Sequence, residues 1–422
     1  MTGSLSVRMT PSDIPNLGIS RRDFLQRTGS ASLLVAFSGV RAQVPYTPLD
    51  PTRKLRIGVV GGGFGLAFPW HEHPNCEVTA VADLRDDRRK GLSEKFKCSN
   101  TYGEFHGMLK DPKVDALAMF TGAPSHVPYC IDTMNAYKHV ICAVPAAISL
   151  EQCHDLVEAV NKTGMMYMNA ETSCFHAATM AARELREQGK FGRIYFSEGA
   201  YFHSGVNDLL SGNMSPAAME IFIYKGEHTW RYGFPPGYYI THASGPVVHV
   251  TGEKLIEVSA IGVKLDHPFY QKNDYNNPFV NETFFFKTSG GNSSRISIHW
   301  WTTEPYREGA DYYGTQASFF EPWMGKPTSV SYKQAETTDV FTLDDYASTL
   351  PPSLRSYADK TKGHGGAEAF IVNEFVSACL EKRKPIVDVH KAVAFAAPGI
   401  CGQHSAMKDG EWIKVPDFGP IS

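Results

Sequence analysis

The sequence predicts an α/β protein with an N-terminal doubly wound parallel sheet and a C-terminal α+β domain built on a large, mainly antiparallel sheet. Two observations indicate this. From residue 54 to 169, short apolar strand patterns alternate with helical patterns, which is typical of a parallel sheet. After residue 172 the alternation stops, and β-rich runs follow at 255–264, 278–288 and 293–301, with helical patterns returning at about 367–380 and 389–407.

The composition indicates a folded protein of about two or three domains in 422 residues. Apolar residues make up 42%, which is enough for a large core and excludes disorder as the overall state. The net charge of −3 gives no general basic field, so we expect no nucleic-acid partner. The eight cysteines form no Cys-x-x-Cys pair, so we expect mostly buried free thiols rather than a zinc site or a disulfide framework.

The first 42 residues have the features of a twin-arginine export signal. Arg21-Arg22 is followed by the apolar pair Phe24-Leu25, a mild apolar stretch covers 31–40, and a small-residue cleavage site ends at Ala42. This stretch is too short to span a bilayer, so no membrane anchor is expected. We therefore predict partnership with the twin-arginine export machinery, a periplasmic or otherwise exported location, and an N-terminal arm at 43–53.

A glycine-rich turn follows the first strand pattern, 54–60. In the sequence Gly61-Gly62-Gly63-Phe64-Gly65, Gly61 is predicted to make a tight turn and Gly63 to admit a pyrophosphate close to the backbone. The N–H groups and dipole of a following helix would then hold the phosphates. The third position of the dinucleotide fingerprint is Leu66, with Gly65 one residue early, so the turn departs slightly from the standard pattern.

An acidic residue lies where a dinucleotide-binding fold places the ribose acceptor. The strand pattern 77–82 ends at Asp83, which is 20 residues beyond Gly63. An acid at this position repels a 2′-phosphate, so NAD is favoured over NADP, although Arg85 or Arg88 would partly reverse that preference. The alternation then continues with strands at 114–120, 138–142 and 165–169 and helices ending at 136 and 161. We predict a nucleotide-binding Rossmann domain at 54–172 and a substrate domain at 173–422.

At this point the sequence resembles the glucose–fructose oxidoreductase / inositol dehydrogenase (Gfo/Idh/MocA) family. The resemblance rests on the glycine turn, Asp83, and the segments 121–126 and 138–145. It implies tightly bound NAD held by a set of residues from this half: Gly61, Gly62, Gly63, Phe64, Asp83, Arg85, Ala123, Pro124, His126, Pro145 and Asn169. His126 has the alternative role of capping a helix.

One departure from that family bears on the chemistry. Its dehydrogenases read Glu-Lys-Pro where this chain has Ala143-Val144-Pro145, and valine cannot move a proton as the lysine does. The segments 144–147, 198–201, 239–246 and 363–366 instead resemble the NAD-dependent α-N-acetylgalactosaminidase branch, glycoside hydrolase family 109. That resemblance implies transient oxidation of the sugar at C3, which acidifies the C2 proton, then elimination of the aglycone, addition of water and return of the hydride.

Three residues of the second half are the catalytic candidates. Tyr201 ends a predicted strand and is expected to be a base or acid at the sugar, with an ordinary strand aromatic as the alternative. His242 opens an apparent helix at 244–250, whose N-terminus would favour the neutral, basic imidazole. His364 lies among glycines, in a loop that suits either substrate contact or helix entry.

Substrate contacts are predicted at Trp230, Arg231 and Tyr239. Arg231 would hold a substrate oxygen or a charged group, with a surface salt bridge as the alternative. Trp300 and Trp301 suit either stacking on a sugar ring or core packing. The 16 histidines are scattered and no carboxylate cluster is evident, so no metal is expected.

Three functions remain open from the sequence. The first is an exported, NAD-containing enzyme that cleaves a glycoside through transient oxidation. The second is a sugar dehydrogenase or sugar–sugar oxidoreductase with net hydride transfer, in which Tyr201 or His242 replaces the missing lysine. The third is a catalytically silent sugar-binding protein. Self-association through the C-terminal sheet is also expected.

Overall fold

The computed structural model describes residues 47–421 apart from short gaps at 205, 207–208, 210, 213, 304–305, 324–327, 333–334, 338–343 and 360–363. The predicted export signal lies outside these residues. The first sheet has six parallel strands in the order β3-β2-β1-β4-β5-β6. Its strands are β1 (Leu55–Val60), β2 (Cys76–Ala82), β3 (Thr101–Tyr102), β4 (Ala116–Met119), β5 (His139–Cys142) and β6 (Tyr167–Asn169). The predicted parallel sheet is confirmed.

Alternate residues of these strands enter two separate apolar clusters, one on each face of the sheet. Val60, Leu117 and Met119 pack with α5 (His126–Asn135) and α6 (Leu150–Thr163). Ile57 and Ala118 belong to the cluster that contains residues of α3 (Asp86–Phe96) and α13 (Ala367–Glu381). Both faces are therefore buried, as the nearly continuous apolar character of the strands requires.

The second sheet has nine strands in the order β16-β15-β14-β13-β7-β12-β11-β10-β17, and only the pair β12–β7 is parallel. Its strands are β7 (Ile194–Phe202), β10 (Leu255–Lys264), β11 (Phe279–Thr288), β12 (Ser293–His299), β13 (Arg307–Gly314), β14 (Ala317–Phe320), β15 (Ser329–Tyr332), β16 (Ala335–Thr337) and β17 (Ile413–Lys414). The predicted mainly antiparallel sheet is confirmed.

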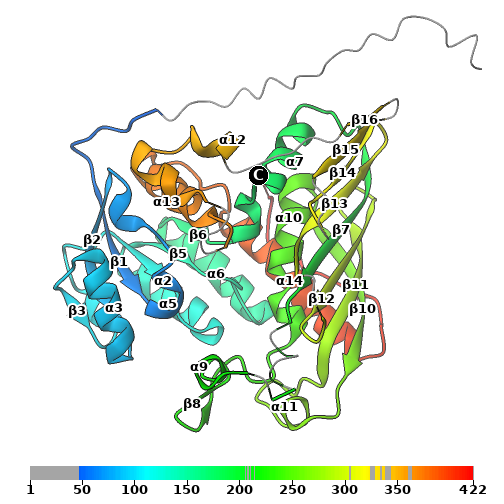
Figure 1. The fold of residues 1–422 in the computed structure, drawn as a ribbon, viewed down its shortest axis with the longest axis horizontal. Coiled ribbons are helices and arrows are strands. Elements are labelled where there is room, and N and C mark those ends of the chain that lie inside the picture. Colours follow the sequence, from blue (N-terminus) through cyan, green and yellow to red (C-terminus); the bar gives the residue numbers. More distant parts are fainter. Residues whose placement is uncertain are drawn as a thin grey trace, which may run out of the picture. The chain divides into compact units, whose positions relative to one another are not determined.

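Helices cover one face of this second sheet. The contacts are made by α10 (Thr241–Thr251) with β7 and β13, and by α14 (Val389–Ala406) with β10. Because α14 also contacts α6 and β6 of the first half, the last long helix joins the two sheets (Figure 1). Phe285, Ile261 and Val263 are exposed on the strands of the sheet.

The remaining helices are short or connect the strands. They are α2 (Gly62–Gly65), α4 (His106–Leu109), α7 (Ala177–Glu187), α9 (Pro216–Met219), α11 (Pro268–Gln271) and α12 (Asp344–Ala347), with 3₁₀ turns η2 (Trp70–Glu72), η3 (Ala123–Ser125), η4 (Thr172–Phe175), η5 (Pro236–Tyr239) and η6 (Pro352–Tyr357). A small hairpin, β8 (Ile223–Tyr224) and β9 (Glu227–His228), belongs to neither sheet.

The sequence explains where the long helices start and stop. The Ser149 hydroxyl accepts the N–H of Gln152 at the start of α6, and Gly164 ends that helix with a φ of 66°. The Asp388 carboxylate accepts the N–H of Lys391 at the start of α14. All eight cysteines are buried and free, as predicted. In the described part of the chain, none of the helices combines the length and apolar character of a membrane span.

Candidate functional site

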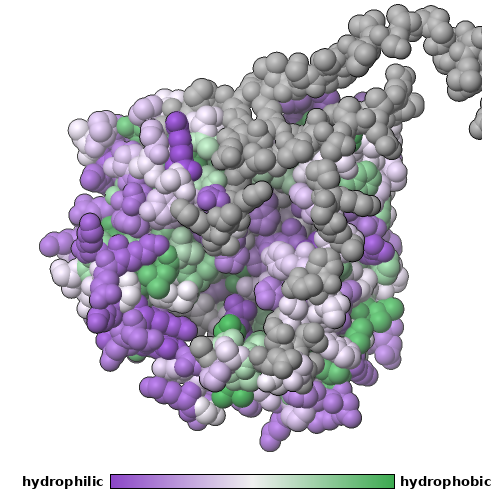
Figure 2. All heavy atoms as spheres, in the orientation of Figure 1, coloured by the Kyte–Doolittle hydropathy of each residue, from purple (hydrophilic) through white to green (hydrophobic). Residues whose placement is uncertain are grey.

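A cavity of about 870 Å³ lies where the two halves of the fold meet. Figure 2 shows the surface hollowed in this region, with hydrophilic and hydrophobic side chains at its border. From the first half it is lined by the glycine turn, Asp83, Arg85, Arg88 and the ends of β4 and β5. From the second half it is lined by a set of aromatic and basic side chains: Tyr201, His203, Trp230, Arg231, Tyr239, His242, Trp300 and His364. The six predicted catalytic and substrate residues thus line one cavity.

The glycine turn is shaped for close approach of a ligand. Gly61 has a φ of 94°, and a Cβ at this residue would lie 2.2 Å from the Phe120 carbonyl oxygen, so only glycine fits. The Gly62 N–H donates to Asp83 Oδ2 at 2.6 Å, and the Arg85 N–H donates to Oδ1 at 2.8 Å. The Asp83 carboxylate is thereby fixed beside the turn, with lone pairs left for ribose hydroxyls.

The regular helix that the sequence predicted after this turn is not present. The structure has a single helical turn, α2, and then reaches Pro69, which has no N–H and is the residue before η2. A four-residue helix has a much smaller dipole than a long one, so a smaller dipole contribution to phosphate binding is expected than the sequence predicted.

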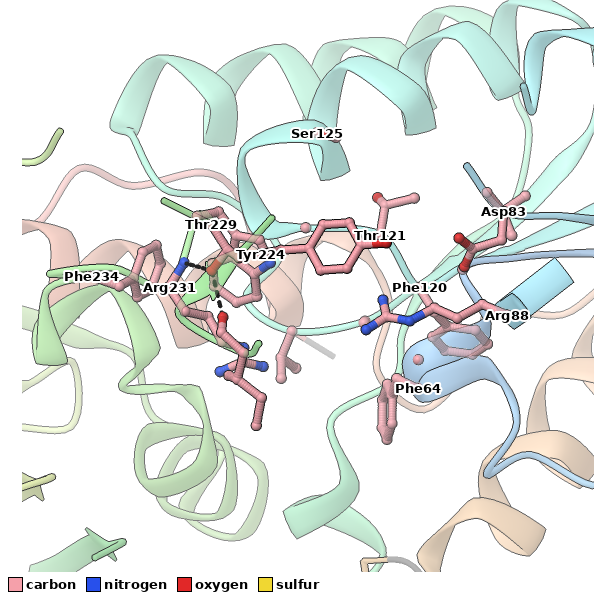
Figure 3. A pocket seen from close by; sticks show the side chains of 18 of the residues that line it. Phe64, Asp83, Arg88, Phe120, Thr121, Ser125, Tyr224, Thr229, Arg231 and Phe234 are labelled. Atoms are coloured by element: carbon pink, nitrogen blue, oxygen red, sulfur yellow. Dashed lines mark hydrogen bonds between the residues drawn. The ribbon is translucent and has the colours of Figure 1, made fainter. Parts of the chain in front are cut away.

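A free cation lies beside the turn instead. The Arg88 side chain would be only 3.2 Å from a Cβ on Gly63, and among the described residues it has no carboxylate partner. Figure 3 shows Arg88 extending past the Phe120 ring, at the same end of the cavity as Asp83 and Phe64, with Arg231 and Phe234 at the other end. Its guanidinium is suitably placed for a phosphate.

Several predicted cofactor residues lie behind the cavity wall rather than on it. Just after β5, the cavity is lined by Ala143 and Val144. His126 is buried, with Nδ1 2.8 Å from the Pro145 oxygen and Nε2 3.0 Å from the Thr121 oxygen, so it links the ends of two strands. Asn169 donates to the carbonyls of Cys142 and Ala143, each at 3.2 Å. Ala123, Pro124, Pro145 and Gly62 are likewise absent from the lining.

Three aromatic rings from the second half of the chain line one end of the cavity. The Tyr201 ring lies 4.8 Å from the His242 ring and 6.1 Å from the Tyr239 ring, and Tyr239 lies 5.1 Å from His242. Burial raises the pKa of Tyr201 above its usual value, more than the charge of His242 lowers it. The Tyr201 hydroxyl is therefore better suited to donate a hydrogen bond than to act as a base.

The structure also contradicts the expectation that His242 is neutral. His242 is the second residue of α10, and its Nδ1 lies 2.8 Å from Glu171 Oε1 and 3.3 Å from Glu308 Oε1. Burial disfavours the charged imidazole, but the two carboxylates outweigh it and raise the pKa of His242 well above its usual value. The two carboxylates therefore affect the pKa of His242 more than the N-terminus of α10 does. Glu171 and Glu308 were not found from the sequence, because they lie 71 and 66 residues from His242.

Arg231 lies between aromatic rings. Its guanidinium carbon is 4.3 Å from the Trp230 ring centroid and 5.5 Å from that of Tyr239, and no carboxylate of the described residues pairs with it. It can therefore offer its donors to a substrate oxygen. Trp300 lines the cavity and packs against the core, whereas Trp301 is exposed.

His364 lies apart from the His242 group. Its Nδ1 is 3.1 Å from Glu368 Oε1, its own N–H donates to the same oxygen at 2.8 Å, and its ring packs edge-on against Phe64 at 4.9 Å. It therefore borders the glycine turn. A role at the cofactor end of the cavity fits this position as well as a role at the sugar.

Two groups of side chains among the described residues have metal-ligand spacing. Glu171, His242 and Glu308 have ligand atoms within 4.8 Å of one another, and so do the exposed residues His154, Asp155 and Glu158. In the first group, Nδ1 of His242 already contacts an oxygen of each carboxylate. The second group is a set of neighbouring surface charges on α6, which is common without a metal.

The fold and the cavity define an NAD-binding protein of the oxidoreductase type. Residues 55–171 match the family described as "Oxidoreductase family, NAD-binding Rossmann fold", and residues 175–420 match "Glycosyl hydrolase 109, C-terminal domain". The chain belongs to the glycosyl hydrolase 109 family. A glycosyl hydrolase family 109 protein of Solibacter usitatus is 25% identical over 94% of this chain and 97% of its own, and one of Parabacteroides distasonis is 25% identical over 94% and 96%.

Solved structures share the fold at lower identity. Levoglucosan dehydrogenase in complex with NADH and levoglucosan has a TM-score of 0.70 and is 18% identical, covering 86% of this chain and 100% of its own. An oxidoreductase from Agrobacterium radiobacter in complex with NAD⁺, L-tartaric acid and magnesium has a TM-score of 0.67 and is 16% identical, covering 86% and 98%. These likenesses confirm the α/β fold, and the family assignment makes the protein an enzyme with NAD as its cofactor.

Proposed function

We propose that the protein is a sugar-active enzyme that cleaves a glycoside without net redox change. In this reaction the sugar is transiently oxidised at C3, the aglycone leaves by elimination, water adds and the hydride returns. Bound NAD would supply the reversible hydride acceptance, held by the glycine turn, Asp83 and Arg88. Membership of the glycosyl hydrolase 109 family supports this proposal.

The observation that carries the proposal is the wall formed by Ala143 and Val144. These residues lie at the end of β5 and line the cavity, and no lysine is found among the described residues that line it. Polar contact with the reacting part of the sugar would therefore come from the group at the other end, Tyr201, Tyr239 and His242. A dehydrogenase of the related family would place a lysine at the position of Val144.

The chain's own residues have distinct tasks in this reaction. Arg231, held over Trp230 and Tyr239, would orient a sugar hydroxyl. Tyr201 would donate a hydrogen bond to a substrate oxygen. Phe64, Trp300 and the apolar wall at Val144 would keep bulk water away from the reacting carbon atoms.

The experiment begins with purified mature protein and no added nucleotide. The released nucleotide is identified after denaturation, and the native protein is assayed against aryl glycosides of both anomers. The proposal predicts bound NAD, release of the aryl alcohol and no accumulation of NADH. Turnover that requires added nucleotide and accumulates NADH would instead indicate a sugar dehydrogenase, and sugar binding without turnover would indicate a silent binding protein.

We also propose export by the twin-arginine route, because a folded protein then carries its NAD with it. Replacing Arg21 and Arg22 by lysine should leave the protein inside the cell, as fractionation would show.

We further propose a nucleotide-binding domain at 54–172 and a substrate domain at 173–422. We also propose self-association through the exposed strands that carry Ile261 and Phe285. Size measurement of the Ile261→Lys variant tests the last point.

A further inference from the structure

Two buried carboxylates face the same nitrogen of the candidate catalytic histidine. Glu171 follows β6, Glu308 lies on β13, and His242 lies in the first turn of α10. The side chains are 0%, 4% and 5% exposed respectively, and both carboxylates reach Nδ1 of His242, at 2.8 and 3.3 Å. Placing two carboxylates on one histidine nitrogen is far more than is needed to orient a neutral ring.

Further contacts fix these carboxylates in place. The Ser173 hydroxyl donates to Glu308 Oε1 at 2.5 Å and its backbone N–H donates to Glu171 Oε1 at 3.1 Å. The hydroxyl of Tyr306 donates to Glu308 Oε2. Glu171 Oε2 is buried and finds no hydrogen-bond partner among the described residues. A buried carboxylate that is satisfied this incompletely requires a nearby positive charge.

The contacts also determine which nitrogen of His242 faces the substrate. Nδ1 lies against three oxygen atoms, those of Glu171, Glu308 and Ser173 at 3.2 Å, and the Ser173 hydroxyl hydrogen is already used toward Glu308. All three oxygens accept, so Nδ1 carries a proton. These contacts all occupy Nδ1, and His242 lines the cavity, so Nε2 is the ring nitrogen available to a ligand.

The other titratable groups around His242 do not cancel this arrangement. Tyr201 on β7 and Tyr239 on η5 pack against its ring and are neutral when protonated. His176 Nε2 lies 3.9 Å from Glu308 Oε1, farther from that oxygen than His242 Nδ1 at 3.3 Å. Arg231 contacts Tyr239 rather than His242.

We propose that Glu171 and Glu308 are positioning residues that hold His242 as an imidazolium ion in the resting enzyme, so that its Nε2–H is a hydrogen-bond donor to a sugar oxygen that gains negative charge. This inference rests on the proposed function for the identity of that oxygen: the C3 oxygen, which becomes enolate-like when the C2 proton is removed. A cationic donor there stabilises the charge as it develops. It also means that His242 is not the base of the resting enzyme.

The direct test is the protonation state of His242, which requires no turnover. Protein labelled with ¹⁵N-histidine and containing its NAD is examined by NMR, with the His242 signals assigned by their loss in His242→Gln. Both ring nitrogens should carry protons at pH 7 in the wild type. In the Glu171→Gln, Glu308→Gln double variant the ring should lose one of these two protons. The conservative single variant Glu308→Asp keeps the carboxylate and should largely keep both protons.

A matched control removes a different buried glutamate. Glu321, just after β14, is buried and bonds to Thr179, and Glu321→Gln should leave the His242 signals unchanged. If either single variant fails to fold, the other single variant and Ser173→Ala carry the test. A neutral His242 in the wild type at pH 7, or an imidazolium that persists in the double variant, would overturn the proposal. So would a stoichiometric divalent metal whose removal by a chelator changes the His242 signals.

Activity gives a second readout with opposite signs for the two roles. If His242 acts as a cationic donor, kcat falls as pH rises through the pKa of His242. Glu308→Gln should then move this alkaline fall to lower pH by about one pH unit or more, with kcat affected more than KM. If His242 acts as a resting base, the variant would instead shift an acidic limb and extend activity to lower pH. Failure of the glycosidase assay removes this readout but leaves the NMR result interpretable.

Discussion

The guanidinium of Arg85 lies 2.9 Å from the Glu220 carboxylate, although the two residues belong to different halves of the chain. Arg85 precedes α3 and lies three residues after β2, and Glu220 is the C-cap residue of α9. Arg85 also lies over the Tyr224 ring at 4.2 Å. At the other end of the same segment, the Trp230 ring would lie 2.6 Å from a Cβ on Gly122. Residues 220–230 are therefore fastened across the nucleotide end of the cavity.

We expect these contacts of residues 220–230 to slow the release of NAD. Glu220→Gln removes the ion pair and should therefore raise the NAD dissociation rate. Because the pair is partly exposed, it contributes at most about 1 kcal/mol, which corresponds to a roughly fivefold increase. The rate is measured by the fluorescence change when bound NADH is displaced. Glu227→Gln, an exposed residue of the adjacent hairpin, is the control. Equal rates in all three proteins would show that the segment does not retain the nucleotide.

Arg88 should contribute to nucleotide affinity through the phosphates that NAD and NADP share. Since charge-assisted hydrogen bonds contribute about 1.5–3 kcal/mol, Arg88→Gln should weaken NAD binding about 10- to 100-fold, as measured by calorimetry on the nucleotide-free protein. Lys90→Gln changes a surface charge on the same helix and serves as the control. A loss of NADP binding alone would instead assign Arg88 to the 2′-phosphate.

Gly61→Ala should destabilise the protein and abolish NAD binding. The new Cβ would overlap the Phe120 carbonyl oxygen and require a φ of 94°, so we expect a loss of about 2 kcal/mol or more in the free energy of unfolding. Gly164→Ala separates the two effects, because Gly164 also has a positive φ of 66° but no atom lies within 4 Å of its Cβ. Equal losses in the two variants would mean that the contact with Phe120 is unimportant.

A buried carboxyl predicts that stability falls as pH rises. Glu282 accepts the Gly237 N–H at 2.5 Å, and burial raises its pKa to about 8. Between its ordinary pKa near 4.5 and about 8, the folded protein keeps a proton that the unfolded chain releases, so the free energy of unfolding decreases over this range. Glu282→Gln removes the effect and should gain about 2–4 kcal/mol relative to wild type between pH 5 and pH 8.

Denaturant unfolding at several pH values measures this difference. The exposed Glu411→Gln variant is the control and should follow the wild-type pH dependence. A difference between Glu282→Gln and wild type that is constant with pH would show that Glu282 is ionised in both the folded and the unfolded states.

The sequence predicts the first half of the fold well because its signals are local. Apolar strand patterns, the glycine turn and Asp83 lie within about 30 residues of one another, and each strand end is marked by its neighbours. The strands β13 to β16 were not predicted. β13 reads Arg-Glu-Gly-Ala-Asp-Tyr-Tyr-Gly, and its pairing with β7 and β14 makes it a strand. Tertiary pairing overrides weak β-propensity there.

In the candidate site, too, the residues with local sequence signals were predicted and those brought together only by folding were not. Tyr201, Arg231 and His242 were found because their residue types and neighbouring segments point to chemistry. Glu171 and Glu308 were missed because no pattern near either residue shows that it faces His242. The protonation state of His242 could not be predicted for the same reason, since it depends on charges brought together only by folding.

The central claim is that the glycosidic bond is cleaved by oxidation and elimination rather than by direct hydrolysis. The most direct test is to run the reaction on an aryl glycoside in D₂O and to analyse the released sugar by NMR and mass spectrometry. We predict one deuterium at C2, because the C2 proton is removed and then replaced from solvent, and no net NADH. Aryl release with hydrogen fully retained at C2, or NADH formed in step with product, would contradict the account.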